Sequence, residues 1–281
     1  MRAGLGKTAA ALALGLMAAM ACGACGSSSS TAVDPSDAAS DAQPEPDGPI
    51  PEQDAGPDVA DARQDVIAPP GGYCASLVPK PKFCDDFDDG DLTNDWDQPT
   101  AVGGSLMALD EASYTSPPAS FVVQTQNLTV ATSGNALLRK TVFGAVAHVK
   151  LSFSMLTPTV TFTKGIISIA TLDVSTNHFF TLSLRDQDAV PAASLEEYVG
   201  ATMTRHVLTR LPPAGVWTRI TIDLDFTAGK ANVTFDALKA LDAEPIMPVP
   251  GTEATIRVGG VYIEGPADPF KASFDDVVVD F

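Results

Sequence analysis

Hydrophobic and polar residues alternate with a period of two in many short runs between Gly71 and the C-terminus. His148–Leu156 shows the pattern most clearly, with four apolar residues separated by lysine and serine. Val216–Phe226 repeats it except at Thr218, and Phe179–Arg185 repeats it over a shorter span. Because successive side chains of a strand point to opposite faces, this period predicts half-buried antiparallel strands.

Further runs with the composition of strands follow the same pattern. They are Ser120–Thr125, Ala136–Phe143, Gly165–Leu172, Ala201–Thr209, Lys230–Phe235, Ala254–Glu264 and Phe274–Phe281. Glycine, proline, asparagine and aspartate separate them, as expected of turns. We therefore predict an all-β, antiparallel two-sheet sandwich over residues 71–281. One short helical turn is expected at Ala237–Leu241, and a β-bulge at Gly259 and Gly260.

The N-terminus has a different pattern. Arg2 and Lys7 precede an uncharged apolar run of fourteen residues, Thr8–Ala21. A bilayer span needs about 20 residues, so the run is too short to cross a membrane. Its length and flanks are typical of a signal peptide, which we assign to residues 1–25.

Small residues surround two cysteines at the end of this run, Cys22 and Cys25, and Ser27–Ser30 follow. The arrangement resembles the bacterial lipobox, in which the cysteine thiol is acylated and becomes the new N-terminus. Cys22 lies at the end of the apolar run and is slightly preferred, while Cys25 borders the serines. The resemblance implies a lipid-anchored envelope protein, and the glycine after either cysteine favours the outer membrane. The alternative is an ordinary secretory signal with incidental cysteines.

Residues 26–70 contain ten acidic residues, one basic residue, eight prolines and no aromatic residue. Such a segment cannot bury enough apolar surface to fold, which predicts a disordered, extended tether. A partner-binding acidic tail is the alternative. Residues 71–281 carry 25 acidic and 14 basic side chains, and the whole chain has a net charge of −18. This charge argues against nucleic-acid binding and leaves acyl chains as the membrane partner.

Three motifs occur at the beginning, middle and end of the predicted sandwich: Phe83–Gly90 followed by Trp96, Val216–Asp223, and Phe274–Val279. Together they resemble the strands of laminin-G-like and concanavalin A-like jelly rolls, the lectin and glucanase type. The resemblance implies a jelly roll in which the closing strand lies beside the opening strand. It also implies a glycan or an envelope protein as the partner of the domain.

The same resemblance implies a structural Ca²⁺ between the first and last strands, with Asp86, Asp88 and Asp276 as oxygen ligands. Acidic strand ends without a metal are the alternative. Cys74 and Cys84 are the cysteines that remain after the signal region. Since export leads to an oxidising compartment, we expect a disulfide between them.

Motifs that carry catalytic chemistry are scarce. The three histidines are about thirty residues apart, which does not match zinc spacing. Asp223 and Asp225 share a strand face about 7 Å apart, a separation that an acid–base pair would tolerate, although a solvated face is favoured. Glu196 and Glu197 are adjacent and should face opposite ways. We therefore assign no catalytic residue.

Aromatic side chains that could stack on sugars are few. The candidates are Trp96, Tyr114, Tyr198 and Tyr262. The favoured hypothesis is a lipid-anchored, non-catalytic jelly roll that binds a glycan or a protein. The alternatives are a structural envelope lipoprotein with no small ligand, and a glycan-cleaving enzyme or its inactive remnant.

Overall fold

The computed structural model describes residues 72–129, 132–158, 165–187, 190–248 and 251–281. The predicted signal peptide, its cysteines Cys22 and Cys25, and the predicted tether at 26–70 lie outside these residues. Within the described part of the chain, no helix is long and apolar enough to cross a membrane.

The described chain is built almost entirely of strands, with one helical turn at its start. The elements are α1 (Gly72–Ser76), β1 (Phe83–Asp85), β2 (Gln98–Val102), β3 (Leu106–Asp110), β4 (Ser120–Gln124), β5 (Ser133–Val146), β6 (His148–Leu156), β7 (Ile166–Ser175), β8 (His178–Gln187), β9 (Val190–Val199), β10 (Thr202–Val207), β11 (Thr218–Asp225), β12 (Lys230–Phe235), β13 (Leu238–Pro245), β14 (Gly251–Glu264) and β15 (Lys271–Asp280).

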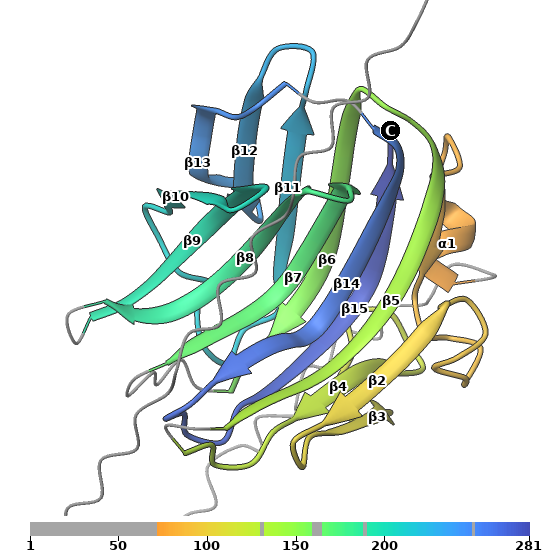
Figure 1. Ribbon diagram of the computed structural model, residues 1–281. Coiled ribbons are helices and arrows are strands. Elements are labelled where there is room, and N and C mark those ends of the chain that lie inside the picture. The colour runs from red at the N-terminus through yellow and green to blue at the C-terminus, as the bar shows by residue number, and fades with distance from the viewer. Residues whose placement is uncertain (1–71, 130–131, 159–164, 188–189, 249–250) are drawn as a thin grey trace, which may run out of the picture. The chain divides into compact units, whose positions relative to one another are not determined.

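The strands form two antiparallel sheets packed face to face (Figure 1). The eight-stranded sheet has the order β13-β12-β11-β6-β15-β4-β3, with β1 paired to β15. The seven-stranded sheet has the order β10-β9-β8-β7-β14-β5-β2. This is the predicted all-β jelly-roll sandwich. The predicted position of the closing strand is also confirmed, because Phe83 pairs with Val279 and Asp85 with Val277.

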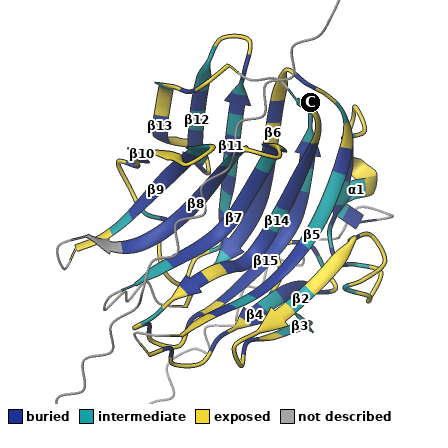
Figure 2. Ribbon diagram, in the orientation of Figure 1, coloured by how far each residue is buried: buried dark blue, intermediate teal, exposed yellow. Residues whose placement is uncertain are grey.

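The period-two pattern explains which side chains form the core. In β11 the buried residues begin at Thr218 and recur at every second position as far as Leu224. Figure 2 shows the buried stripes running along the central strands of both sheets. A chain of phenylalanine rings, Phe87, Phe121, Phe274 and Phe153, connects the strands near the start and end of the domain, with successive ring centroids 5.8–5.9 Å apart.

A disulfide joins Cys74 and Cys84, as predicted, and attaches α1 to β1. Ten positions separate the two cysteines along the chain. For a loop of this size, the chain-entropy model gives a contribution of about 2–3 kcal/mol to stability. The bridge therefore holds the entry segment against the first strand, next to the acidic residues that follow Cys84.

Several details differ from the sequence prediction, and strands β2 and β3 were not predicted at all. Ala237–Leu241 is not helical, because a tight turn leads directly into β13. Val216 was expected in the core but is 54% exposed, since β11 begins only at Thr218. Strand β9 escaped prediction because charged and hydroxyl side chains interrupt its apolar pattern. The bulge near Gly259 is confirmed by the register shift between Val258 and Tyr262.

Candidate functional site

The outward face of the seven-stranded sheet carries polar residues in rows that cross the strands. Residues paired across antiparallel strands point to the same face, so the register defines these rows. The central row consists of Arg139, Arg257, Thr171, Thr181, Glu196 and Arg205. The neighbouring row consists of Thr141, Thr255, Asp173, Phe179, Tyr198 and Met203.

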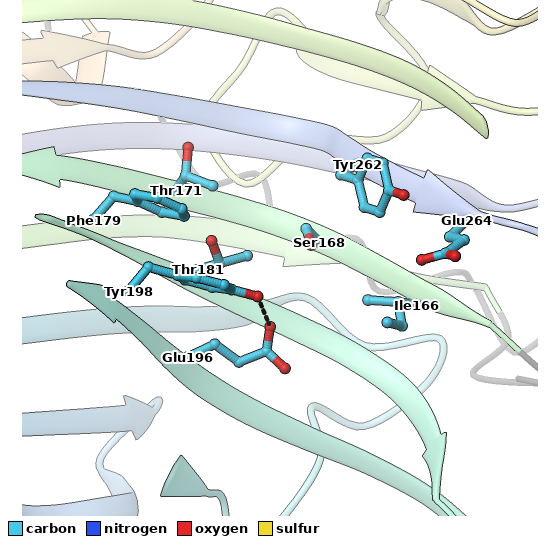
Figure 3. A pocket seen from close by; sticks show the side chains of 9 residues that line it. All are labelled: Ile166, Ser168, Thr171, Phe179, Thr181, Glu196, Tyr198, Tyr262 and Glu264. Carbon is cyan, nitrogen blue, oxygen red and sulfur yellow. Dashed lines mark hydrogen bonds between the residues drawn. The ribbon is translucent and has the colours of Figure 1, made fainter. Parts of the chain in front are cut away.

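A cavity of about 350 Å³ opens on this face. Its lining residues come from β7, β8, β9 and β14: Ile166, Ser168, Thr171, Phe179, Thr181, Glu196, Tyr198, Tyr262 and Glu264. Figure 3 shows Ser168 and Thr181 between the tyrosine of β14 and the tyrosine of β9. Because these central side chains are small, they leave room above the sheet while offering hydroxyl donors and acceptors.

Two aromatic rings form one wall of the cavity. Phe179 and Tyr198 are cross-strand partners, and their rings stack with centroids 4.5 Å apart and an interplanar angle of 9°. Opposite them, Tyr262 is 45% exposed. Burial, and next the carboxylate of Glu264, raise the pKa of Tyr262 above its ordinary value. The cavity therefore presents flat apolar rings beside a floor of hydroxyl groups.

Glu196 organises the buried end of the cavity. Its Oε1 accepts hydrogen bonds from Arg185 and from Nε of Arg205 at 3.1 Å, and its Oε2 accepts one from the Tyr198 hydroxyl at 3.1 Å. Burial and the Glu196 carboxylate raise the pKa of Tyr198, so the phenol stays protonated and donates. Glu196 is thus neutralised by two guanidinium groups and fixes the orientation of the Tyr198 ring.

The four predicted aromatic candidates differ in their burial and in whether they line the cavity. Tyr198 and Tyr262 line the cavity. Trp96 is only 5% exposed, packs on Phe83 and donates its indole N–H to Asp85, so it is unavailable to a ligand. Tyr114 is 40% exposed but does not line the cavity, because it lies on the connection between β3 and β4, two strands of the eight-stranded sheet.

The sequence did not single out Phe179, Arg185 or Arg205, nor the hydroxyl residues of the cavity, Ser168, Thr171 and Thr181. Each sits within a predicted strand, but its role depends on neighbours that only the sheet register supplies. The prediction that Glu196 and Glu197 face opposite sides of a strand is confirmed. Glu196 lines the cavity, whereas Glu197 bonds to the buried His178.

The remaining predicted acid pair has a structural role. Asp223 bonds to Nε2 of His148 at 2.6 Å, and Asp225 accepts the backbone N–H of Ala228 in the following turn. Both carboxylates lie on the outward face of the eight-stranded sheet, among exposed and half-buried strand residues. These contacts support the solvated-face interpretation.

Several aspartates gather where β1 meets β15. Oδ2 of Asp86 and Oδ2 of Asp88 lie 2.6 and 2.5 Å from the point that a Cβ on Gly72 would occupy, so the two carboxylates converge there and the position requires glycine. Oδ1 of Asp88 is buried without a hydrogen-bond partner. Both oxygens of Asp276 accept hydrogen bonds from the hydroxyls of Ser116 and Thr115.

These oxygens bear on the predicted Ca²⁺ site. Asp86 and Asp88 offer two converging carboxylates, which is a fitting start for a hard cation. Asp276 is close enough to raise the pKa of Asp88, although burial and Asp86 contribute more. Among the described residues, no group of three or more His, Cys, Asp or Glu side chains is arranged to hold a metal ion. Calcium at Asp86, Asp88 and Asp276 therefore stays a prediction.

The acidic cluster should make stability depend on pH. Burial raises the pKa of Asp85 to about 6, and burial together with neighbouring carboxylates raises those of Asp88 and Asp275 to about 7. In the unfolded chain these groups titrate near 3.9. The folded state therefore holds more protons between about pH 4 and 7, and the stability from these groups is lost as pH rises through that window.

We expect Asp88→Asn to raise the melting temperature at neutral pH in the presence of a chelator, and to leave it unchanged near pH 4. Millimolar Ca²⁺ should stabilise the wild type at neutral pH and should not stabilise Asp88→Asn. Thermal denaturation followed by circular dichroism measures both effects, with the exposed Glu111→Gln as the charge-matched control. A variant that melts like the wild type at neutral pH would contradict the first expectation.

Comparison with known proteins supports the architecture. No protein-family model matches the chain, and no curated protein matches it. Among solved structures, an endo-β-1,4-glucuronan lyase from the fungus Trichoderma reesei superposes with a TM-score of 0.53 at 12% identity, covering 71% of this chain and 95% of the lyase. A cellulose-induced protein, Cip1, superposes with a TM-score of 0.50 at 16% identity, covering 70% of this chain and 96% of Cip1. At these identities the likeness concerns the fold alone.

Proposed function

We propose that the domain binds glycan chains without cleaving them, on the outward face of its seven-stranded sheet. The observation that carries the proposal is the cavity in which the stacked Phe179 and Tyr198 rings and the exposed Tyr262 surround a floor of serine and threonine hydroxyls. Saccharides combine apolar ring faces with dense hydroxyl groups, so they match both surfaces. Concave sites with a few convergent polar groups are typical ligand sites.

The fold likeness adds a weaker argument. One similar structure is named as a lyase of β-1,4-glucuronan, and the other as a cellulose-induced protein. One fold hosts many functions, so this supports a carbohydrate ligand only by analogy. The cavity residues observed in this chain remain the main support.

Binding is favoured over cleavage by the state of the acidic and phenolic groups. Both carboxylate oxygens of Glu196 already accept hydrogen bonds within the sheet, Oε1 from Arg185 and Arg205 and Oε2 from Tyr198. Tyr198 and Tyr262 have raised pKa values, which is unfavourable for a phenolate base. The second candidate is glycan hydrolysis, because Glu196 and Glu264 line the same cavity and two carboxylates are what that reaction needs.

A glycan array probed with the purified protein tests the proposal. We expect binding to at least one polysaccharide class, with the sugar recovered intact after incubation. Release of shortened products would favour the hydrolytic candidate instead. Absence of binding to every glycan on the array would contradict the proposal and favour a structural envelope protein.

We further propose that acyl chains on Cys22 or Cys25 anchor the domain to the outer membrane. Two or three chains would hold it stably, since a single chain binds only marginally. Mass spectrometry of the native N-terminus should find a lipid-modified cysteine as the first residue, in the outer-membrane fraction. An unmodified cysteine, or a mature chain that starts elsewhere, would contradict the anchor.

A further inference from the structure

Arginine is concentrated on the outward face of the seven-stranded sheet. Residues 72–281 contain six arginines, and four of them face outward there: Arg139, Arg185, Arg205 and Arg257. This is unexpected in a chain whose net charge is −18. Three of the four have a carboxylate partner within the sheet. Arg185 and Arg205 share Glu196, and Arg257 contacts both carboxylate oxygens of Asp173 at 2.9 and 2.8 Å.

Arg139 is different. Among the described residues it has no ion-pair partner, and its buried Nε has no hydrogen-bond acceptor. Its cross-strand neighbour is Arg257, so a second guanidinium lies beside it without contributing an acceptor. A half-buried cation with an unsatisfied donor is unfavourable until an anion arrives. The planar guanidinium group of arginine also matches a carboxylate in shape, because it can donate two parallel hydrogen bonds to the two carboxylate oxygens.

The position of Arg139 connects it with the cavity. Arg139, Arg257 and Thr171 are successive partners in the central row, and Thr171 lines the cavity. Strands are about 4.8 Å apart, so Arg139 lies about 10 Å from Thr171 along the row. That distance is longer than one sugar ring. A ligand that occupies the cavity and reaches Arg139 is therefore an oligosaccharide that crosses the strands.

We infer that the ligand is an acidic glycan, a chain of uronic acid residues, and that Arg139 binds one of its carboxylates. This inference rests on the proposed glycan-binding function and names the class of glycan. The sugar rings stack on the aromatic side chains of Tyr198, Phe179 and Tyr262. Arg139 makes the site prefer acidic glycans over neutral ones. The acidic remainder of the domain would repel such a chain, so binding is confined to this face.

Pairs of oligosaccharides with the same backbone test the inference. Fragments of glucuronate, galacturonate and mannuronate–guluronate polymers are each compared with their carboxyl-reduced, neutral counterparts by isothermal titration calorimetry. We expect at least one acidic fragment to bind about 10-fold or more tightly than its reduced form, because one charge-assisted hydrogen bond corresponds to at least that factor. Arg139→Ala should abolish the difference, and Arg139→Lys should restore only part of it.

The exposed Arg210→Ala removes the same charge outside the rows and should retain wild-type selectivity. Unchanged melting temperatures would show that the variants are folded, and the salt dependence of wild-type binding gives a readout that needs no variant. Equal binding of acidic and reduced fragments, or preference for sulfated glycans on the array, would overturn the inference while leaving glycan binding intact. Failure of every glycan to bind would overturn the proposed function and the inference together.

Discussion

Glu197→Ala should lower the free energy of unfolding by about 3–5 kcal/mol, which corresponds to roughly 6–20 °C in melting temperature for a domain of this size. Glu197 is 4% exposed and lies between the sheets. Its Oε1 accepts hydrogen bonds from Nε2 of His178 and from the backbone N–H of Met247, both at 2.8 Å. Its Oε2 lies 4.0 Å from Nε2 of His206.

The size of the effect follows from what remains after truncation. His178 is 2% exposed and packs against Phe180 and Phe226, so its ring cannot turn to water for a new partner. The Met247 N–H, just beyond β13, would also lose its acceptor. An unpaired buried donor carries its full desolvation penalty, whereas an exposed one does not.

Thermal and urea denaturation of the purified protein measure this change. Glu244→Ala is the matched control, because Glu244 approaches Nδ1 of His206 at 3.9 Å from a side chain that is 46% exposed. Its loss should cost less than about 1 kcal/mol. If Glu197→Ala were no more destabilising than Glu244→Ala, the buried cluster would not be holding the two sheets together.

Phe179→Ala and Tyr198→Ala should each weaken glycan binding by about 10- to 100-fold, with little change in melting temperature for Phe179→Ala. Buried aromatic anchors commonly contribute about 2 kcal/mol or more to binding, and each 1.4 kcal/mol is a factor of ten. The two rings stack on each other at 4.5 Å, so removing either one also frees its partner to move. Titration calorimetry with a glycan selected from the array measures the loss.

Tyr198→Phe separates stacking from hydrogen bonding. It keeps the ring but removes the hydroxyl that donates to Glu196, so we expect an affinity close to that of the wild type. Tyr114→Ala, on the connection outside the seven-stranded sheet, controls for general loss of aromatic surface. Wild-type affinity in both Phe179→Ala and Tyr198→Ala would place the glycan elsewhere on the domain.

Two of the four predicted aromatic candidates, Tyr198 and Tyr262, line the cavity. Comparing Trp96 with Tyr198 shows why the sequence could not separate the buried candidate from the exposed one. Trp96 and Tyr198 both belong to polar surroundings in the sequence, so composition does not distinguish them. Trp96 is buried because the turn after β1 folds it onto Phe83 and Phe87. Tyr198 is partly exposed because the side chains beside it in the cavity, Ser168 and Thr171 of β7 and Thr181 of β8, are small.

The period of two was enough to predict the sandwich, because each strand buries alternate side chains whatever its neighbours are. The resemblance of three motifs to jelly rolls also implied that β1 lies beside β15, and the expected export of Cys74 and Cys84 indicated their disulfide. The disulfide depends on residues that are close in sequence, the sandwich on a burial pattern that the sequence repeats, and the β1–β15 pairing on the family resemblance.

Only the tertiary structure decided which outward-facing residues meet. Arg139, Thr171 and Glu196 come from three separate strands, and a shift of one residue in any register would send a side chain into the core. The register itself results from packing across the whole sheet, including the bulge at Gly259. For this reason the sequence alone predicted the scaffold, while the cavity and its unpaired arginine emerged only once the strands were aligned.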